Sequence, residues 1–295
     1  MALSNTTLFF NDLLHQDVST SVVTAGASAG SDTENGWSVN QVRYSDNMRG
    51  WKPPNGANDN WIQIDGGSTT WAGSAGQYIW WAAAADTRGV TAGGLRVYQD
   101  ISDNPAGTFS TYRTSLPVPM ANSPVVSYAT HVLSPKQYYR IKQLNVDRGG
   151  STVTIPIYRL SAYAEASLFK IHSASPYVTD IAGPGELALT SRAAIQETLA
   201  GMILSNKTGW NSIEFELTFR PASETLWQNL SDQLYNIGIS KQSIFMIFEG
   251  LDDRGNDRNA CYARVVGGAW NATRAVQGAY DTTIIFRTEA FPIGG

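Results

Sequence analysis

The stretch Trp61-Ile62-Gln63-Ile64-Asp65 decides the fold class of this chain. It alternates apolar and polar residues with a period of two, as a strand does when one face meets a core and the other meets solvent. The stretch Leu95-Arg96-Val97-Tyr98 repeats this alternation. Turn residues such as Pro53-Pro54-Asn55-Gly56 separate the candidate strands. These patterns predict a mainly β protein.

Short strands of this kind fill the first part of the chain. They are expected at residues 6–10, 20–24, 39–44, 61–65, 78–84, 95–99, 109–114, 125–130, 138–146 and 152–164. Many short strands with regular turns and no convincing helix indicate an antiparallel β-sandwich. We therefore predict a first domain over residues 1–165.

The pattern changes around residues 162–167, where we place the boundary to a second domain, residues 166–295. Strands are expected there at residues 212–219, 243–249, 262–266 and 282–288, with a helix at about residues 222–236. Leu226, Leu230 and Leu234 recur at helical spacing with Trp227 beside them, so one helix face is apolar, and Gly238 is expected to end the helix. This predicts a β-sandwich or barrel with one packed α-helix.

Composition narrows the classes of partner. Charged residues make up 16% of the 295 residues and the formal net charge is −4, with no basic stripe to follow a phosphate backbone, so no nucleic-acid contact is expected. The single cysteine, Cys261, excludes an internal disulfide. Neither a signal peptide nor a membrane span is expected, and the protein is expected to be made in the cytoplasm.

Motifs for catalysis or for metal binding are weak. Gly26-Ala27-Ser28-Ala29-Gly30 matches a nucleophile elbow, but a turn-like stretch follows it where the elbow needs a helix. The three histidines show no ligand spacing, and residues 252–257 resemble a calcium loop without its closing glutamate. We therefore expect a binding and assembly protein, without a cofactor, rather than an enzyme.

Tryptophans gather between residues 37 and 81. Trp61 and one of the pair Trp80/Trp81 are expected in the core, because successive strand residues face opposite sides. Trp51 and Trp71 lie in loops rich in Gly, Pro and Asn and are the candidates for an exposed surface. A role at an interface or as a loop anchor is favoured for them over a role in stacking on a glycan.

Residues 42–53 followed by Asn60-Trp61-Ile62-Gln63-Ile64-Asp65 resemble the opening of the discoidin and galactose-binding-like sandwich. Tyr138-Tyr139-Arg140-Ile141-Lys142 is similar to a later strand of that family. The resemblance covers about residues 1–165 and implies a jelly-roll fold. The family's usual leucine-glycine after the aspartate is replaced here by Gly66-Gly67, and no ligand residues carry over.

Residues 213–219, the helix after Ala222 and the strand at residues 282–287 resemble the β-sandwich-plus-helix of bacteriophage tail-tube proteins. The stretch at residues 8–14, followed by a discoidin-like sandwich, resembles minor tail proteins of siphophages. In distal tail proteins the two modules often come in the opposite order.

The resemblance implies a structural virion protein of the phage tail tip, assembled in the host cytoplasm. It would form a ring, expected to be a hexamer, between the tail-tube and tail-tip or hub proteins. Leu226, Trp227 and Leu230 are the candidate assembly residues, and host-surface glycan contact would fall to the first domain. The alternative is a carbohydrate-binding, lectin-like protein outside any virion.

Overall fold

The chain divides into two compact units. Met1–Phe10 and Leu168–Gly295 form one, called here the split unit, and Asn11–Ser167 form the other, the inserted unit. The computed structural model describes residues 5–15, 24–27, 37–43, 50–53, 60–66, 78–86, 89–100, 109–111, 126–133, 136–164, 168–171, 179–181, 187–190, 193–197, 203–207, 212–221, 224–240, 243–249, 259–266, 271–276 and 279–289. The prediction of a mainly β protein is confirmed.

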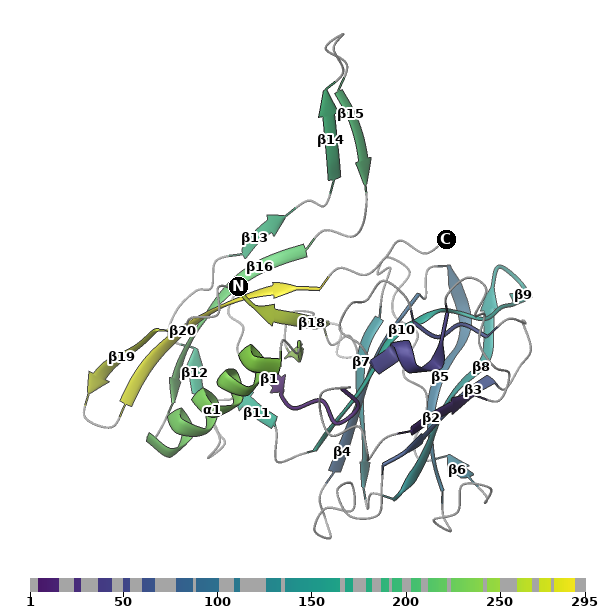
Figure 1. Ribbon diagram of the computed structural model, residues 1–295, viewed down its shortest axis with the longest axis horizontal. Helices are drawn as coiled ribbons and strands as arrows, with labels where there is room; N and C mark the ends of the chain where they lie inside the picture. Colours follow the sequence, from purple (N-terminus) through teal and green to yellow (C-terminus); the bar gives the residue numbers. More distant parts are fainter. Residues whose placement is uncertain are drawn as a thin grey trace. The chain divides into compact units, whose positions relative to one another are not determined.

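The described strands of the inserted unit form two sheets (Figure 1). Its elements are β2 (Thr24–Ala27), the 3-10 helix η1 (Val39–Arg43), β3 (Asn60–Asp65), β4 (Tyr78–Ala85), β5 (Val90–Asp100), β6 (Phe109–Thr111), β7 (Val126–Leu133), β8 (Tyr138–Arg148), β9 (Ser151–Thr152) and β10 (Ile157–Ala164). One sheet has the order β2-β3-β8-β5-β6, with β9 paired to β8, and the other has the order β10-β4-β7. All these pairings are antiparallel.

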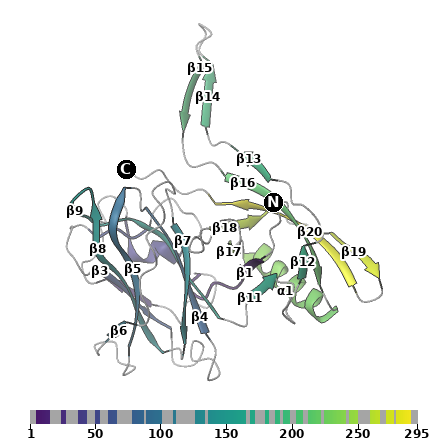
Figure 2. The same cartoon turned by 180° about the vertical axis from the view of Figure 1, so that it is seen from behind.

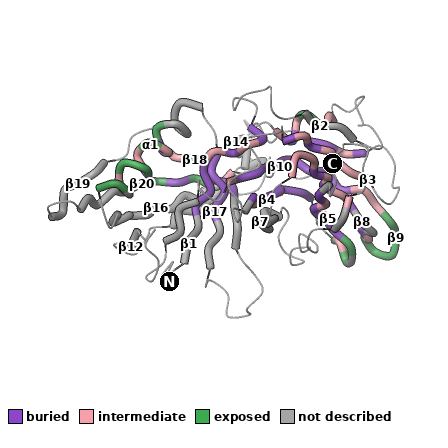
Figure 3. The backbone as a smooth tube through the Cα atoms, turned by 90° about the horizontal axis from the view of Figure 1, so that it is seen from below, coloured by how far each residue is buried: buried purple, intermediate pink, exposed green. Residues whose placement is uncertain are grey.

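Both sheets contribute to one hydrophobic core. Ile62 and Ile64 of β3 are buried in the same cluster as Trp81 of β4 and Leu160 of β10. The strands β4 and β10 are buried along almost their whole described length (Figure 3). Burial of branched and aromatic side chains at roughly 25 cal/mol per Å² is the main stabilising term for such a core.

The described residues of the split unit form a nine-stranded sheet, the separate strand pair β14-β15 and one helix. Its elements are β1 (Asn5–Phe9), β11 (Leu168–Ile171), β12 (Thr179–Ile181), β13 (Leu187–Thr190), β14 (Ala193–Glu197), β15 (Ile203–Lys207), β16 (Ser212–Pro221), α1 (Glu224–Ser240), β17 (Ile244–Glu249), β18 (Asn259–Val265), β19 (Asn271–Val276) and β20 (Ala279–Thr288). The sheet order is β11-β1-β17-β18-β20-β16-β12, with β13 paired to β16 and β19 to β20.

The first strand, β1, belongs to the split unit, although the prediction had assigned it to the first domain. It pairs with β11 on one side and with β17 on the other, and Phe9 is the cross-strand partner of Leu168. The ring of Phe9 also packs on that of Phe245 at 5.3 Å. The chain therefore leaves the sheet after β1, builds the inserted unit and returns at the neighbouring position. A local strand pattern cannot show this, because the partners of β1 are distant in sequence.

Two hairpins extend from the central pair β16–β20. At one end, β13 pairs with the start of β16, with Thr190 opposite Ser212, and the ribbon continues as β14–β15. Among the described strands, β14 and β15 pair only with each other, and they run side by side in both views (Figure 1, Figure 2). At the other end, β19 pairs with the start of β20. Because β16 and β20 are antiparallel, the two hairpins lie at opposite ends of this pair.

Two local predictions were wrong. Residues 39–43 form η1 instead of a strand, because Gln41 N donates to Ser38 O at 3.0 Å, a bond of the i to i+3 type. The helix α1 does not end at Gly238 but continues to Ser240. One glycine costs only about 1 kcal/mol in a helix and does not by itself end one. In the described part of the chain, no helix is long and apolar enough to cross a membrane.

Candidate functional site

The outer face of the sheet β2-β3-β8-β5-β6 carries aromatic and charged side chains. Along β3, Ile62 and Ile64 are buried, whereas Trp61, Gln63 and Asp65 are half-buried on the opposite side. The antiparallel register aligns these residues with outward residues of β8 and β5, so that they form rows across the sheet. We call this surface the row face.

The row face has three rows. The first holds Trp61, Lys142 and Arg96, the second Gln63, Arg140 and Tyr98, and the third Asp65, Tyr138 and Phe109. Adjacent strands lie about 4.8 Å apart, so the members of one row are direct neighbours. Cations therefore occupy the first two rows, and the carboxylate of Asp65 lies in the third.

Arg140 lies between two aromatic rings. Its guanidinium carbon is 4.1 Å from the centroid of the Trp61 ring and 3.9 Å from that of the Phe109 ring. Its Nε also donates a hydrogen bond of 2.9 Å to Gln63 Oε1. Stacking on both sides together with this bond holds the planar guanidinium in one orientation. The cation is therefore fixed in place on the face, at a lower entropic cost for binding a ligand.

A second cation contacts an aromatic ring in the adjacent position. Lys142 Nζ lies 4.6 Å from the centroid of the Tyr98 ring. Arg96, the cross-strand partner of Lys142, is exposed to solvent. In the third row, Gln137 Nε2 donates to Asp65 Oδ1 at 3.1 Å. Each of the first two rows thus combines a ring with at least one positive charge, and the third offers acceptor oxygens.

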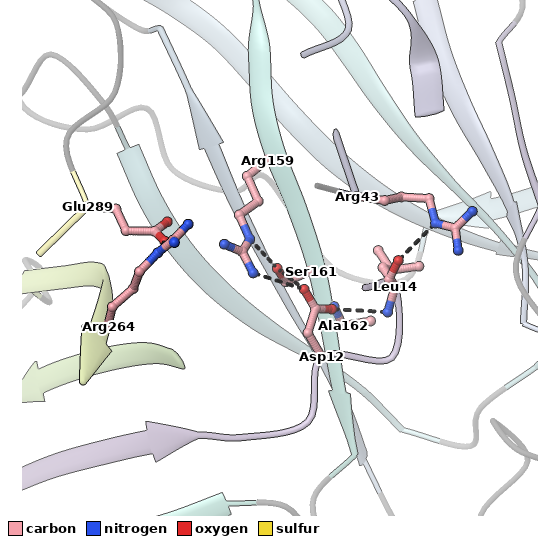
Figure 4. A network of polar contacts seen from close by, with 8 residues as sticks. All are labelled: Asp12, Leu14, Arg43, Arg159, Ser161, Ala162, Arg264 and Glu289. Carbon is pink, nitrogen blue, oxygen red and sulfur yellow. Dashed lines mark hydrogen bonds and ion pairs between the residues drawn. The ribbon is translucent and has the colours of Figure 1, made fainter. Parts of the chain in front are cut away.

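A buried polar cluster holds the segment that enters the inserted unit (Figure 4). Asp12 Oδ2 accepts a 2.6 Å hydrogen bond from Ser161 Oγ and lies 3.5 Å from Arg159 Nη2, with both charged side chains fully buried. Its other oxygen, Oδ1, accepts from the backbone N–H groups of Leu14 at 3.0 Å and Ala162 at 3.1 Å. This cluster binds the segment to β10, and its burial leaves no opening for a ligand.

Asp147 closes the turn between β8 and β9. Its Oδ1 accepts hydrogen bonds from Thr91 Oγ1 at 2.7 Å and from Gly150 N at 2.9 Å. The Thr91 bond, followed by the Gly150 bond, lowers the pKa of this carboxyl below 3.8. Gly149 and Gly150 both adopt positive φ, which the turn requires. The arrangement is that of a structural turn.

Trp51 is buried, which corrects the prediction that it lies on an exposed surface. Its side chain has no exposed area, and its backbone exchanges hydrogen bonds of 2.8 and 2.9 Å with Ile157. The preceding Gly50 permits this approach, since a Cβ there would lie 1.8 Å from the Ile157 oxygen. The loop composition gave no sign of this docking. Trp71, the other candidate, lies outside the described residues.

The candidate assembly residues on α1 fall into different classes. Leu230 is buried together with Leu234, so it packs inside the chain and is not free for a neighbouring subunit, contrary to the prediction. Trp227 is half-buried, and the side chain of Leu226 lies outside the described part. Among the described side chains of α1, Tyr235 is a large hydrophobic residue that is exposed, with 61% of its surface accessible.

Trp61 was expected in the core, but it lies on the outer face under Arg140. The two isoleucines of β3 occupy the inward phase, and this phase could have identified Trp61 as outward. For the pair Trp80/Trp81 the prediction is confirmed, since Trp81 is buried and Trp80 half-buried.

Ser28 of the elbow-like motif and residues 252–257 lie outside the described residues. Across the residues that the structure describes, no group of three His, Cys, Asp or Glu could hold a metal ion.

No protein-family model matches the chain, and a search of curated proteins found no match.

Proposed function

We propose that this chain is a structural protein of a phage tail tip, in which the split unit assembles into a ring and the inserted unit contacts the host surface. The ring would be a hexamer and would join the tail tube to the tip or hub proteins. The site of action would be the virion, after assembly in the host cytoplasm. The inserted unit would be the galactose-binding-like sandwich of this arrangement.

The single observation that carries the assembly role is the pair of hairpins at opposite ends of β16–β20. A two-stranded hairpin is marginally stable in water without further packing. The ribbon β14–β15 has no other strand partner among the described residues. Contact with a neighbouring copy would supply the missing packing and cover its open edges.

Opposite placement of the two hairpins favours a ring over a two-fold dimer. A ring needs two different surfaces on each subunit, one that binds the next copy and one that is bound by the previous copy. The β14–β15 hairpin and the β19–β20 hairpin differ in sequence and lie at opposite ends of one strand pair. They supply such a pair of surfaces.

The topology also supports the two-module resemblance. The inserted unit leaves the sheet after Phe9 and returns at Leu168, and these two residues are cross-strand partners. In the proposed arrangement, the ring module would be interrupted by the sandwich rather than follow it. A module attached through neighbouring strand ends can be added to an assembling sheet without breaking its hydrogen-bond ladder.

The test is the assembly state of the full chain. Native mass spectrometry and electron microscopy should show a closed ring, and the protein should bind the tail-tube protein of the same phage. A variant that lacks residues 193–207 keeps the β13–β16 and β16–β20 pairings and is expected to stay folded but monomeric. A wild-type protein that remains monomeric at high concentration and does not bind the tube protein contradicts the proposal.

A second candidate function is a carbohydrate-binding protein outside any virion. The row face favours it, because rings such as Trp61 and Tyr98 beside fixed polar groups are suited to sugar binding. Assembly separates the two functions. A monomer that binds a glycan through the row face would favour this second function.

A further inference from the structure

We infer that the row face binds an acidic polysaccharide, a polymer of sugars that carry carboxylates. This inference names the ligand class of the proposed glycan contact, and it rests on that part of the proposed function. It moves the contact from Trp51, which is buried, to the outer face of β3, β8 and β5.

The first step is the pairing of rings with cations. Trp61 with Lys142 in the first row, and Tyr98 with Arg140 in the second, place an aromatic side chain beside a positive charge. A uronic acid has the matching pair, an apolar ring face and a carboxylate on the same unit. Arginine and lysine bind carboxylates by charge-assisted hydrogen bonds. A polymer of phosphates without sugar rings would leave the aromatic side chains unused.

The second step is the position of the acidic residue. Asp65 occupies the third row, next to Arg140 of the second. Its carboxylate can accept hydrogen bonds from the hydroxyls of a sugar unit whose own carboxylate binds a neighbouring cation. Single-stranded nucleic acid also uses aromatic and basic sheet faces, but it needs a continuous positive groove. The isolated cations of the first two rows, set beside the Asp65 acceptor, match the separate carboxylates and hydroxyls of a sugar acid and do not form such a groove.

The third step is that the central cation is held ready. Arg140 is stacked between Trp61 and Phe109 and bonded to Gln63, so its orientation is set before a ligand arrives. Binding then does not have to order this side chain, which would otherwise weaken the affinity. Arg96 is exposed at the end of the first row, where it adds a second positive charge beside Lys142.

The test uses the full chain and three probes: alginate, which is a polymer of uronic acids, its propylene glycol ester, in which the carboxylates are masked, and single-stranded oligothymidylate. Isothermal titration calorimetry should show binding to alginate that weakens as salt is added. The double variant Arg96→Gln/Lys142→Gln should lose roughly tenfold or more of this affinity. The control Arg148→Gln/Arg287→Gln removes the same charge elsewhere and should bind as the wild type.

Any of four results overturns the inference: no binding to alginate, equal binding to its ester, tighter binding to oligothymidylate, or unchanged alginate binding by Arg96→Gln/Lys142→Gln. Thermal unfolding of each variant confirms that it is folded. The assembly state is measured on the same samples, which separates the two proposals. If the protein forms a ring but does not bind alginate, the inference of acidic-polysaccharide binding is wrong and the proposed assembly role stands. If the wild type binds the ester and Arg96→Gln/Lys142→Gln does not, the row face still binds a glycan, but it does not prefer an acidic one.

Discussion

The guanidinium of Arg140 lies 4.1 Å above the Trp61 ring, across the junction of β8 and β3. The Phe109 ring of β6 covers its other side at 3.9 Å. Three strands of the sheet are thereby connected through one planar cation. A lysine would keep the charge but not the plane that stacks between two rings.

Arg140→Lys is expected to lower the free energy of unfolding by about 1 kcal/mol, because the ammonium cannot stack on both rings or reproduce the bond to Gln63. Urea unfolding followed by circular dichroism measures the change. Arg96→Lys, at an exposed position of the same face, is the control and should fall within about 0.5 kcal/mol of the wild type. Equal effects of the two substitutions would show that the stacked geometry contributes nothing.

Asp12→Ala should destabilise the protein by about 3 kcal/mol or more, because it removes the carboxylate that faces the buried Arg159 and accepts from Ser161. The double variant Asp12→Ala/Arg159→Met should recover part of this loss, since no buried charge remains without its carboxylate. Chemical unfolding of the wild type, both single variants and the double variant gives the coupling energy. Simple additivity of the two single effects would refute a direct interaction.

Gly50→Ala should cost about 2 kcal/mol or more, because the new Cβ would lie 1.8 Å from the Ile157 oxygen and would separate Trp51 from β10. Tryptophan fluorescence during thermal unfolding reports the change. Gly149→Ala provides the comparison: nothing lies within 4 Å of its Cβ, and only its positive φ is strained, at about 1 kcal/mol. A smaller effect at Gly50 than at Gly149 would contradict the docking of this loop.

Asp147→Ala should lower the melting temperature at neutral pH, with a deficit that shrinks as the solution is acidified. The bonds from Thr91 and Gly150 hold the pKa of this carboxyl below 3.8 in the folded state. A lowered folded pKa means that the stabilisation is present above pH 3.8 and is lost as the pH falls through the folded value. Melting curves from pH 7 to pH 2 test this. A deficit that stays constant with pH would contradict it.

The strand content of the inserted unit was readable from sequence because its strands alternate in polarity. Ile62 and Ile64 fixed the inward phase of β3, and the predicted strand at residues 61–65 matches β3 within one residue. Several strands of the split unit were not predicted. Ala193–Glu197, for example, is short and mixed in polarity and forms a strand only through its partner β15.

The row face could be predicted only in part. Tyr138-Tyr139-Arg140-Ile141-Lys142 alternates, and this places Arg140 and Lys142 on one side of a strand. The sequence does not show that Trp61 and Phe109 enclose Arg140, because residues 61, 109 and 140 meet only through the register of three strands. The prediction that Trp51 is exposed was wrong because a loop rich in Gly and Pro can turn inward as well as outward.

The pairing of Phe9 with Leu168 also sets an order of events during synthesis. β1 leaves the ribosome before its partners β11 and β17, which follow only after the whole inserted unit has been made. If that unit folds as it emerges, Asp12 and Ala162 bring its two ends together, and the closure entropy of a long loop no longer opposes the pairing. The inserted unit would then act as a folding template that delivers β11 to β1.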